Sequence, residues 1–453
     1  ERKPLDVIII GAGNVGYTIA DALSRIHNVT TVDLDEKKVT DVQESLNVGT
    51  LQANGASPVV LQKIITKSTS MILAVTQSDE TNMFSCMAAK AIKPDIQTVA
   101  RIRDHEYIFK TEPNGTYLGA DHIISPELLT ADKMARIALI ENAVDYEELE
   151  AMGLLVVTFI VRKEHSSFLG EAVINLNLPD LASIVAIYRG DEVIVLNEST
   201  QLREGDLVCV LGKKEGIDQF NRMMGMAREA KDFVILGGGI IGRRIAKLLE
   251  KEKSYVRLLE KDENKCHVLS REFDHVLVIN ANAVDPRALR AENVGAADVL
   301  ISATNSDEKN LLACLVARQL GIQKVISRYS RREYEDVFAM TRIHGAIGYH
   351  RVVANEITKR MISDENAILQ MRHPKELFFS IILNEKSGLA MMPVGDLKMP
   401  EGSRIVAIMR DGEAIFPRLN TPLMVGDKLL IFAYEVKMSK LEKLFHTVIE
   451  ASI

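Results

Sequence analysis

The sequence predicts an α/β protein in which two parallel-sheet domains occur in tandem, each followed by a small α+β domain. Two observations lead to this prediction. A glycine-rich strand-to-helix turn occurs twice, beginning at Gly11 and at Gly237, and an acidic residue ends the next apolar segment at Asp33 and at Glu260. Matching residues stay about 225 positions apart through both halves, far beyond the period of solenoid repeats, which indicates a duplication of whole domains.

Apolar segments alternate with helical patterns in the first part of each half. In the first half, the predicted strands and helices are Asp6–Ile10, Gly16–Ile26, Val29–Val32, Met71–Val75, Glu80–Ala91 and Gln97–Ile102. This alternation predicts a Rossmann-like parallel sheet with helices on both faces. A connecting helix is predicted to follow over Ser125–Ala143, with Pro126 at its start, because proline favours the first helical position.

The remainder of each half is predicted to contain short strands separated by glycine and proline turns. The expected strands are Leu154–Val161, Ser183–Tyr188, Glu192–Leu196 and Leu207–Leu211, then Phe378–Leu383, Arg404–Met409, Glu413–Phe416 and Lys428–Phe432. The predicted domains are 1–122 with a connecting helix at 123–145, 146–227, 231–348 with a connecting helix at 349–365, and 366–453. The joints are expected near residues 145, 228 and 366.

The composition excludes several classes of function. The 453 residues carry a net charge of −7, contain no tryptophan and are 5% aromatic, which argues against nucleic acid as a partner. The longest apolar run, Gly153–Val161, is too short for a bilayer span, which needs about 18 residues. Cys86, Cys209, Cys266 and Cys314 are scattered, which predicts buried free thiols in a reducing cytoplasm.

The two glycine turns are suited to binding a diphosphate. The first glycine permits a tight turn, the second lets backbone approach a phosphate, and the third lets helix and strand pack closely. The helix that follows offers unpaired N–H groups to an anion. Asp33 and Glu260 are then placed to bind ribose hydroxyls, and their charge disfavours the 2′-phosphate of NADP. NAD, NADH, ATP and ADP all remain open, because each has a ribose and a diphosphate.

Polar residues follow two further strands of each predicted sheet. Thr76 and Gln77 end one strand, and Arg101 and Arg103 end the next. Ligands of doubly wound sheets bind at these carboxyl ends, and arginine suits a phosphate. Ser78 and Asp79 are predicted to cap the helix that comes after. The matching residues of the second half are Thr304, Asn305 and Arg328.

Taken together, these motifs resemble the TrkA family, whose repeating units are called RCK domains. The resemblance rests on both glycine turns, the two acids, the segments Ala74-Val75-Thr76, Asp79-Glu80-Thr81-Asn82-Met83 and Ala100-Arg101-Ile102-Arg103, and the late motifs Ala186-Ile187-Tyr188-Arg189-Gly190 with Gly205-Asp206 and Ala407-Ile408-Met409-Arg410-Asp411-Gly412 with Gly426-Asp427. It covers nearly the whole chain. It implies a cytoplasmic protein without catalytic residues, peripheral on the inner face of the cell membrane, that forms a homo-oligomeric ring beneath an integral-membrane potassium transporter subunit and gates it in response to nucleotides.

The resemblance also implies NAD(H) as the ligand, with ATP and ADP as further candidates, and assigns residues to it. In the first half these residues are Gly11, Ala12, Gly13, Asn14, Val15, Asp33, Gly55, Thr76, Gln77 and Arg101; in the second half they are Gly237, Gly238, Gly239, Ile240, Ile241, Glu260, Thr304, Asn305 and Arg328. Two departures distinguish the second site, which has Ile240 where the first has Asn14 and no counterpart of Arg103.

Two other functions remain open at this point. An NAD-dependent dehydrogenase would need an acid–base group at the nicotinamide, for which His105 and His122 are candidates. A cytosolic regulator of a different cation channel or exchanger would use the same nucleotide sites. A metal site is not expected, because the spacing of Asp35, Asp79 and Glu80 matches no metal-binding loop.

Overall fold

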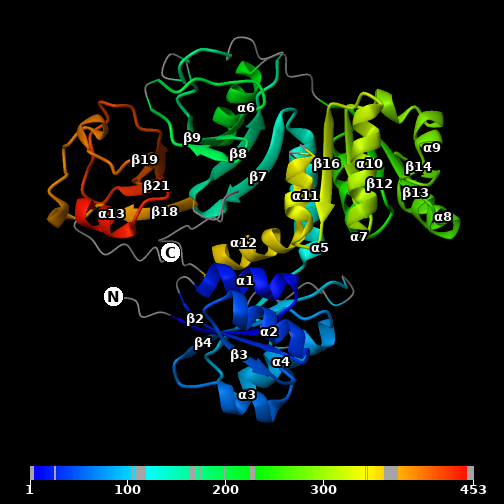
Figure 1. Ribbon diagram of the computed structural model, residues 1–453, viewed down its shortest axis with the longest axis horizontal. Helices are drawn as coiled ribbons and strands as arrows, with labels where there is room; N and C mark the ends of the chain where they lie inside the picture. The colour runs from blue at the N-terminus through cyan, green and yellow to red at the C-terminus, as the bar shows by residue number, and fades with distance from the viewer. Residues whose placement is uncertain are drawn as a thin grey trace.

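The computed structural model describes residues 5–24, 27–104, 107, 119–163, 169–173, 176, 178–197, 199–224, 230–341, 343, 345–361 and 376–445. Figure 1 shows two helix-flanked sheets and two smaller β-rich units in one chain. Two of the predicted joints, near residues 228 and 366, lie outside the described residues, and the third, near residue 145, falls within a strand.

The first sheet has six parallel strands in the order β3-β2-β1-β4-β5-β6. Its strands are β1 (Asp6–Ile10), β2 (Asn28–Asp33), β3 (Gly49–Gln52), β4 (Thr69–Ala74), β5 (Gln97–Arg101) and β6 (His122–Ile124), and its helices are α1 (Asn14–Ser24), α2 (Glu36–Ser45), α3 (Pro58–Ile64) and α4 (Asp79–Ile92). This strand order is that of a doubly wound nucleotide-binding domain, so the predicted fold class is confirmed.

The second sheet repeats this plan in the order β14-β13-β12-β15-β16-β17. Its strands are β12 (Asp232–Leu236), β13 (Tyr255–Glu260), β14 (Val276–Asn280), β15 (Val299–Ser302), β16 (Lys324–Tyr329) and β17 (Gly345–Gly348), and its helices are α7 (Ile240–Lys251), α8 (Glu263–Glu272), α9 (Pro286–Ala291), α10 (Asp307–Gln319) and α11 (Tyr334–Met340). Strands β3 and β6 of the first sheet are additions to the four strands predicted there, and the second sheet repeats them as β14 and β17.

The connecting helices are α5 (Pro126–Leu139) and α12 (Tyr349–Met361). Helix α5 begins at Pro126 as predicted but is shorter than the predicted Ser125–Ala143, because Ala143 already starts strand β7 (Ala143–Leu149). Ala143 and Asp145 pair with the neighbouring strand β8, and this pairing takes the backbone groups that a longer helix would use. The predicted extension of α12 beyond residue 361 lies outside the described residues.

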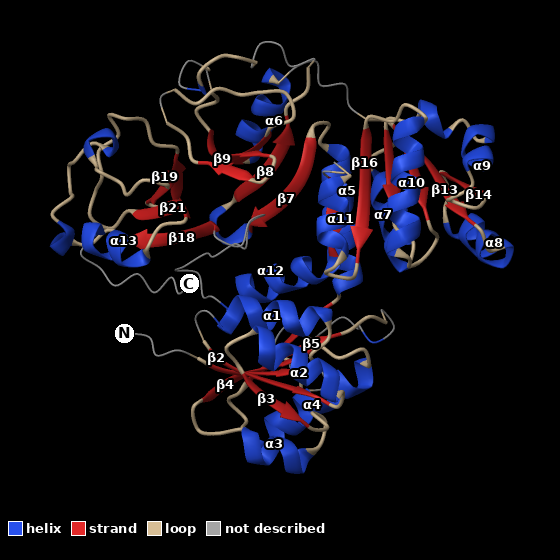
Figure 2. Ribbon diagram, viewed as in Figure 1, coloured by secondary structure: helices blue, strands red, loops and turns tan. Residues whose placement is uncertain are grey.

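Each small unit is an antiparallel sheet with one α-helix among its described residues. Figure 2 shows the strands of both units in red. The first contains β7, β8 (Leu154–Ile160), β9 (Ala182–Arg189), β10 (Glu192–Ile194), β11 (Leu207–Gly212) and α6 (Lys214–Met223); the second contains β18 (Glu376–Ile382), β19 (Ser403–Arg410), β20 (Glu413–Ile415), β21 (Lys428–Tyr434) and α13 (Met438–Phe445). Side chains of both sheets, among them Tyr188, Phe378 and Phe432, share one buried cluster, so the two units pack against each other.

The repeated arginine and Gly-Asp motifs of these units have a structural role. Arg189 donates two hydrogen bonds of 2.8 Å to the Asp206 carboxylate, and Arg410 binds Asp427 in the same bidentate way at 2.7 and 2.8 Å. Both carboxylates are 1% exposed. Such a fork-to-fork pair fixes the orientation of two strands, which explains why the motif recurs in each unit.

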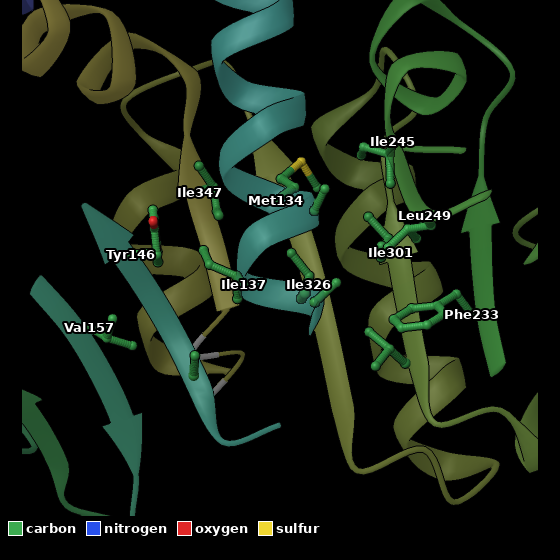
Figure 3. Packing of buried hydrophobic residues seen from close by; sticks show 14 of the residues in the cluster. Met134, Ile137, Tyr146, Val157, Phe233, Ile245, Leu249, Ile301, Ile326 and Ile347 are labelled. Atoms are coloured by element: carbon green, nitrogen blue, oxygen red, sulfur yellow. The ribbon is translucent and has the colours of Figure 1, made fainter. Parts of the chain in front are cut away.

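The connecting helices are exchanged between the halves. Helix α5 packs against α7 of the second half, and Met134 and Ile137 of α5 share one buried cluster with Ile245 and Leu249 of α7 (Figure 3). Helix α12 of the second half lies on α1 of the first half (Figure 1) and buries Val353 there. Each sheet domain is therefore covered in part by a helix from the other half.

Charged groups reinforce this exchange. Lys324 of β16 is buried and donates from Nζ to the carbonyl oxygens of Ile137 and Ile140 at the end of α5. Burial lowers the pKa of Lys324 well below its usual value, so its role here is to donate hydrogen bonds to carbonyl oxygens that the end of α5 leaves without helical partners. In the other direction, Arg244 of α7 binds Asp132 of α5 at 2.8 Å.

Candidate functional site

The first glycine turn has the geometry that a diphosphate requires. Gly11 has a φ of +109°, and its backbone lies against Thr76, where a Cβ would meet the Thr76 nitrogen at 3.0 Å. A Cβ on Gly16 would lie 1.8 Å from the Gly11 carbonyl oxygen, so the helix and the strand can approach only with glycine. A Cβ on Gly13 would meet nothing within 4 Å, which leaves open space beside the turn. The described residues therefore fit a phosphate at Gly13.

The second glycine turn has the same geometry. Gly237 has a φ of +104°, a Cβ on Gly242 would lie 1.9 Å from the Gly237 oxygen, and a Cβ on Gly239 would meet nothing within 4 Å. Gly238 differs, because a Cβ there would lie 2.5 Å from Leu269 Cδ1. Glycine is therefore favoured at position 238 because a larger side chain would collide with Leu269.

The two acids lie beside the turns, as the sequence predicted. Asp33 Oδ2 accepts a hydrogen bond of 2.7 Å from the Ala12 N–H, and Glu260 Oε2 accepts one of 2.8 Å from the Gly238 N–H. Asp33 is partly exposed, whereas Glu260 is 8% exposed. The first acid is therefore more accessible to a ribose than the second.

The helices that start at the turns differ from their neighbours at the N-terminus. Neither α1 nor α7 has an acidic residue in its first turn, and the Gly239 N-cap of α7 offers no side-chain hydrogen bond. By contrast, Asp35 caps α2 and Asp262 caps α8. The first turns of α1 and α7 thus carry no carboxylate of their own that would compete with an anion for the first N–H groups.

A buried asparagine joins the two polar strand ends of the first site. Asn82 Oδ1 accepts from the Thr76 N–H at 2.9 Å and from Thr76 Oγ1 at 2.7 Å, and its Nδ2 donates to the Arg101 carbonyl oxygen at 2.9 Å. Asn310 makes the same bonds to Thr304 and to the Arg328 carbonyl oxygen. Sequence reasoning missed this role, although both asparagines were visible at matching positions.

The remaining predicted residues lie at the rim or beneath the turn. Gln77 and Asn305 are exposed directly after Thr76 and Thr304. Gly55 is buried, and a Cβ there would meet Ile10 Cγ2 at 2.3 Å, so its glycine is required for packing under the first turn.

Asp79 has a different role from the predicted helix cap. Ser78 does cap α4, accepting from the Thr81 N–H, but Asp79 Oδ2 accepts from the backbone N–H groups of Arg103 and Asp104 at 2.9 and 2.8 Å. In the second half, Asp307 holds Ser330 and Arg331 in the same way. Ser330 thus stands where the first half has Arg103, which confirms that the second site lacks this cation.

The arginines of the two sites meet at one side chain. Arg101 Nη2 donates a hydrogen bond of 2.7 Å to the hydroxyl of Tyr349, which in turn donates to Glu127 Oε1 at 2.8 Å. The guanidinium carbons of Arg101 and Arg328 lie 5.5 and 5.9 Å from the centre of the Tyr349 ring. Burial raises the pKa of Tyr349 above its usual value and lowers the pKa of Arg328. Sequence reasoning missed this contact because Tyr349 is more than 200 residues from both Arg101 and Glu127.

The second half also touches the first turn directly. Asn14 Nδ2 donates to the Ser330 carbonyl oxygen at 3.1 Å, and the Arg332 guanidinium lies 3.4 Å from the centre of the Tyr17 ring. Asn14 and Tyr17 belong to the first turns of α1. The first site therefore borders on residues of both halves.

Other chemistry is not brought together in the described part of the chain. No three His, Cys, Asp or Glu side chains there are grouped to hold a metal ion, and no described helix has the length and hydrophobicity of a membrane span. All four cysteines are buried and unbridged, as predicted. Burial raises the pKa of Cys86 and of Cys314 to about 12, so these thiols are poor nucleophiles.

We call each glycine turn, together with the open space beside Gly13 or Gly239, a cradle. The fold and the two cradles define a tandem Rossmann protein with two dinucleotide-type glycine turns. The TrkA-N domain model matches residues 7–126 and 233–352, and the TrkA-C domain model matches residues 157–225 and 378–446. The chain therefore belongs to the TrkA family. It is 32% identical to Trk system potassium uptake protein TrkA homolog 1 of Methanosarcina mazei over 97% of this chain and 100% of that protein. The TrkA homolog of Archaeoglobus fulgidus is 30% identical over 97% of this chain and 99% of that protein.

Solved structures share the fold at lower identity. The GsuK channel has a TM-score of 0.62 and 18% identity, over 98% of this chain and 79% of that chain. The GsuK RCK domain has a TM-score of 0.61 and 18% identity, over 98% of this chain and 96% of that chain. A third structure, of the GsuK channel bound to NAD, has a TM-score of 0.60 and 18% identity, over 98% of this chain and 79% of that chain.

Proposed function

We propose that this protein is a nucleotide-binding regulatory subunit that gates a membrane potassium transporter from the cytoplasmic side. The observation that carries the proposal is the pair of open cradles at Gly13 and Gly239, in a chain whose full-length relatives are named as Trk potassium uptake proteins. Nucleotide binding would shift the protein between two shapes, to an extent set by the difference in affinity between them. The transport pathway would belong to a separate integral-membrane subunit.

The proposed ligands are NAD and NADH, with ATP and ADP as competitors. In each half, a helix N-terminus follows the open space beside the second glycine, and the acid accepts a hydrogen bond from an N–H of the same turn. The arginine ends another strand of the same sheet. At the first site, Asp33 is accessible and Asn14 is polar. At the second site, Glu260 is buried and the matching residue is Ile240. These differences favour tighter nucleotide binding at the first site.

A dehydrogenase is the weaker alternative. His122 is exposed and pairs with Val99, whereas Ile124 pairs with Arg101 at the carboxyl end of β5. His122 is therefore the first residue of the edge strand β6, level with the middle of β5 and not at the carboxyl ends of the strands. The other candidate base, His105, lies outside the described residues. No catalytic residue is proposed.

The gating proposal is tested by transport. The protein is co-expressed with a Trk-type membrane subunit in cells that lack their own potassium uptake, and rubidium uptake is measured. Uptake should depend on this protein and should change when both cradles are blocked by Gly13→Asp and Gly239→Asp. Uptake that is the same with the protein, without it and with the blocked variant would contradict a regulatory role.

Asp33→Ala should weaken NADH and ADP binding at the first site by roughly tenfold, because the ribose hydroxyls lose a charged acceptor. Calorimetric titration with each nucleotide measures the change. Glu260→Ala is the matched control for the second site and should alter the high-affinity phase little. If Asp33→Ala binds both nucleotides as tightly as the wild type, the first site is incorrectly assigned.

The homo-oligomer is proposed to form through equivalent faces of α4 and α10. Phe84 and Met87 of α4 are exposed, and so are Leu312 and Leu315, which occupy matching positions on α10. Residues three apart share one helix face. Two related apolar faces on one chain suit a head-to-tail contact between copies, which closes into a ring when the rotation allows it.

Phe84→Glu combined with Leu312→Glu should therefore reduce the assembly to smaller species, since charges would be buried at the contact. Light scattering after size-exclusion chromatography measures the mass. Val268→Glu, at an exposed position of α8 away from both faces, is the control and should leave the mass unchanged. A double variant that keeps the wild-type mass would exclude these faces as the contact.

A further inference from the structure

Tyr349 belongs to the second half but binds a residue of the first nucleotide site. It is the first residue of α12, which lies on α1 of the first half (Figure 1). Its hydroxyl lies between the Arg101 guanidinium, at 2.7 Å, and the Glu127 carboxylate, at 2.8 Å. Tyr349 and Arg101 are each 8% exposed. The hydrogen bond between them is thus largely shielded from solvent, where such bonds to a charged group are strong.

Arg101 in turn is connected to the glycine turn. Its Nη1 donates to the Thr76 carbonyl oxygen at 3.4 Å, and the Thr76 backbone lies against Gly11. The Nε of Arg101 is buried and has no hydrogen-bond partner. A buried N–H without an acceptor is costly, so a phosphate oxygen that reached it would remove an existing penalty.

We propose that Tyr349 is a positioning residue of the first nucleotide site, whose hydroxyl holds Arg101 toward a bound phosphate. This inference rests on the proposed nucleotide binding. With Tyr349 in this role, the first nucleotide site is complete only when α12 is docked on α1. Phosphate binding and docking of the second half then stabilise each other by the same factor, because such coupling is reciprocal.

The second site lacks this device. Ile124 pairs with Arg101 in the first sheet, and Ile347 pairs with Arg328 in the second, so Pro126 occupies the position that corresponds to Tyr349. The side chain of proline has no acceptor for a hydrogen bond from an arginine. Arg328 instead donates to the Ser330 hydroxyl within its own half. Among the described residues, a hydroxyl from the opposite half therefore binds the strand-end arginine of the first site but not that of the second.

Tyr349→Phe tests the proposal, because it keeps the ring that both arginines face and removes only the hydroxyl. Tyr146→Phe is a close control. The Tyr146 hydroxyl also lies between an arginine, Arg136 at 3.2 Å, and a glutamate, Glu148 at 3.3 Å. Tyr146 is on strand β7, far from the nucleotide sites. The probes are ADP and NADH, which carry a diphosphate, and adenosine, which does not.

The expected result is that Tyr349→Phe binds ADP and NADH about tenfold more weakly in calorimetry and binds adenosine as the wild type does. Tyr146→Phe should match the wild type with all three probes. In an Arg101→Met background, Tyr349→Phe should have no further effect, because the hydroxyl acts through that arginine.

Unchanged ADP and NADH affinity in Tyr349→Phe would overturn the inference while leaving the proposed function in place. An equal loss of adenosine affinity would do the same, because it would indicate general loosening of the site. A loss that persists in the Arg101→Met background would also overturn it. A wild-type protein that binds none of the probes would instead remove the proposed nucleotide site, and this inference with it.

Discussion

Gly13→Asp is expected to weaken diphosphate binding at the first site by at least about 100-fold while changing the free energy of unfolding by less than about 0.5 kcal/mol. A Cβ at Gly13 meets no atom within 4 Å, and its φ lies outside the left-handed region, so the folded chain can accept a side chain. The new carboxylate would occupy the open space and repel the phosphates. Calorimetry with NADH and ADP measures the first effect, and chemical denaturation the second.

Two matched variants sharpen this prediction. Gly239→Asp makes the same change at the second turn and should remove only binding at that site. Gly16→Ala should instead destabilise the fold, because its Cβ would lie 1.8 Å from the Gly11 carbonyl oxygen. If Gly13→Asp unfolds the protein, or binds nucleotide normally, the space beside Gly13 is not a phosphate site.

Glu147→Gln is expected to destabilise the protein by about 2–4 kcal/mol at neutral pH. Glu147 lies on β7, and its side chain is 15% exposed between Lys133 of α5, at 2.7 Å, and Lys359 of α12, at 2.6 Å. It thus ties the two exchanged helices together. A neutral amide would leave Lys359 without this charge and Lys133 with Asp145 alone, at 2.8 Å.

The pH dependence of this effect follows from the pKa of Glu147. Burial alone would raise it, but the charges of Lys133 and Lys359 lower it from 4.5 to about 2. Because the folded-state pKa is the lower one, the carboxylate contributes its full stability above about pH 4.5 and loses it as the pH falls toward 2. The difference between wild type and Glu147→Gln should therefore shrink between pH 5 and pH 3, as urea denaturation at about these values can measure.

Glu148→Gln is the control for this prediction. Glu148 neighbours Glu147 on the same strand, but its side chain is 37% exposed and pairs with Arg136 at the surface. Its loss should cost less than about 1 kcal/mol. Equal effects of the two variants, or a Glu147→Gln effect that does not decrease in acid, would contradict the prediction. Either result would show that the ion pairs of Glu147 do not hold α5 and α12 together.

The glycine turns, the strands beside them and the arginines at the strand ends were predictable because each follows from local chemistry. The chain must reverse at Gly11 with positive φ and pack closely at Gly16, and few residues besides glycine allow this. The glycine turn and the acid at Asp33 could therefore be predicted from spacing, whereas Gly55 was assigned only through the family resemblance. The role of Asn82 could not, because an asparagine after a helix cap gives no sign that its side chain points back to two strand ends.

The strands that sequence reasoning missed have weak patterns. The edge strand β7 reads Ala-Val-Asp-Tyr-Glu-Glu-Leu, with charged residues at three of its seven positions, and β6 has only three residues. Their pairing is decided by neighbouring strands rather than by their own preference. The exchange of α5 and α12 was equally hidden, since an apolar helix face fits the sheet of its own half as well as that of the other.

The exchange of α5 and α12 has a consequence for how the two halves can diverge. In an assembly of two identical chains, every contact at the crossover would occur twice, so one substitution would change both sides at once. Joining both copies in a single polypeptide removes that restriction. Pro126 and Glu127 on one side can be matched by Tyr349 and His350 on the other. Residues around one glycine turn can therefore change while the other half keeps the helix that supports it.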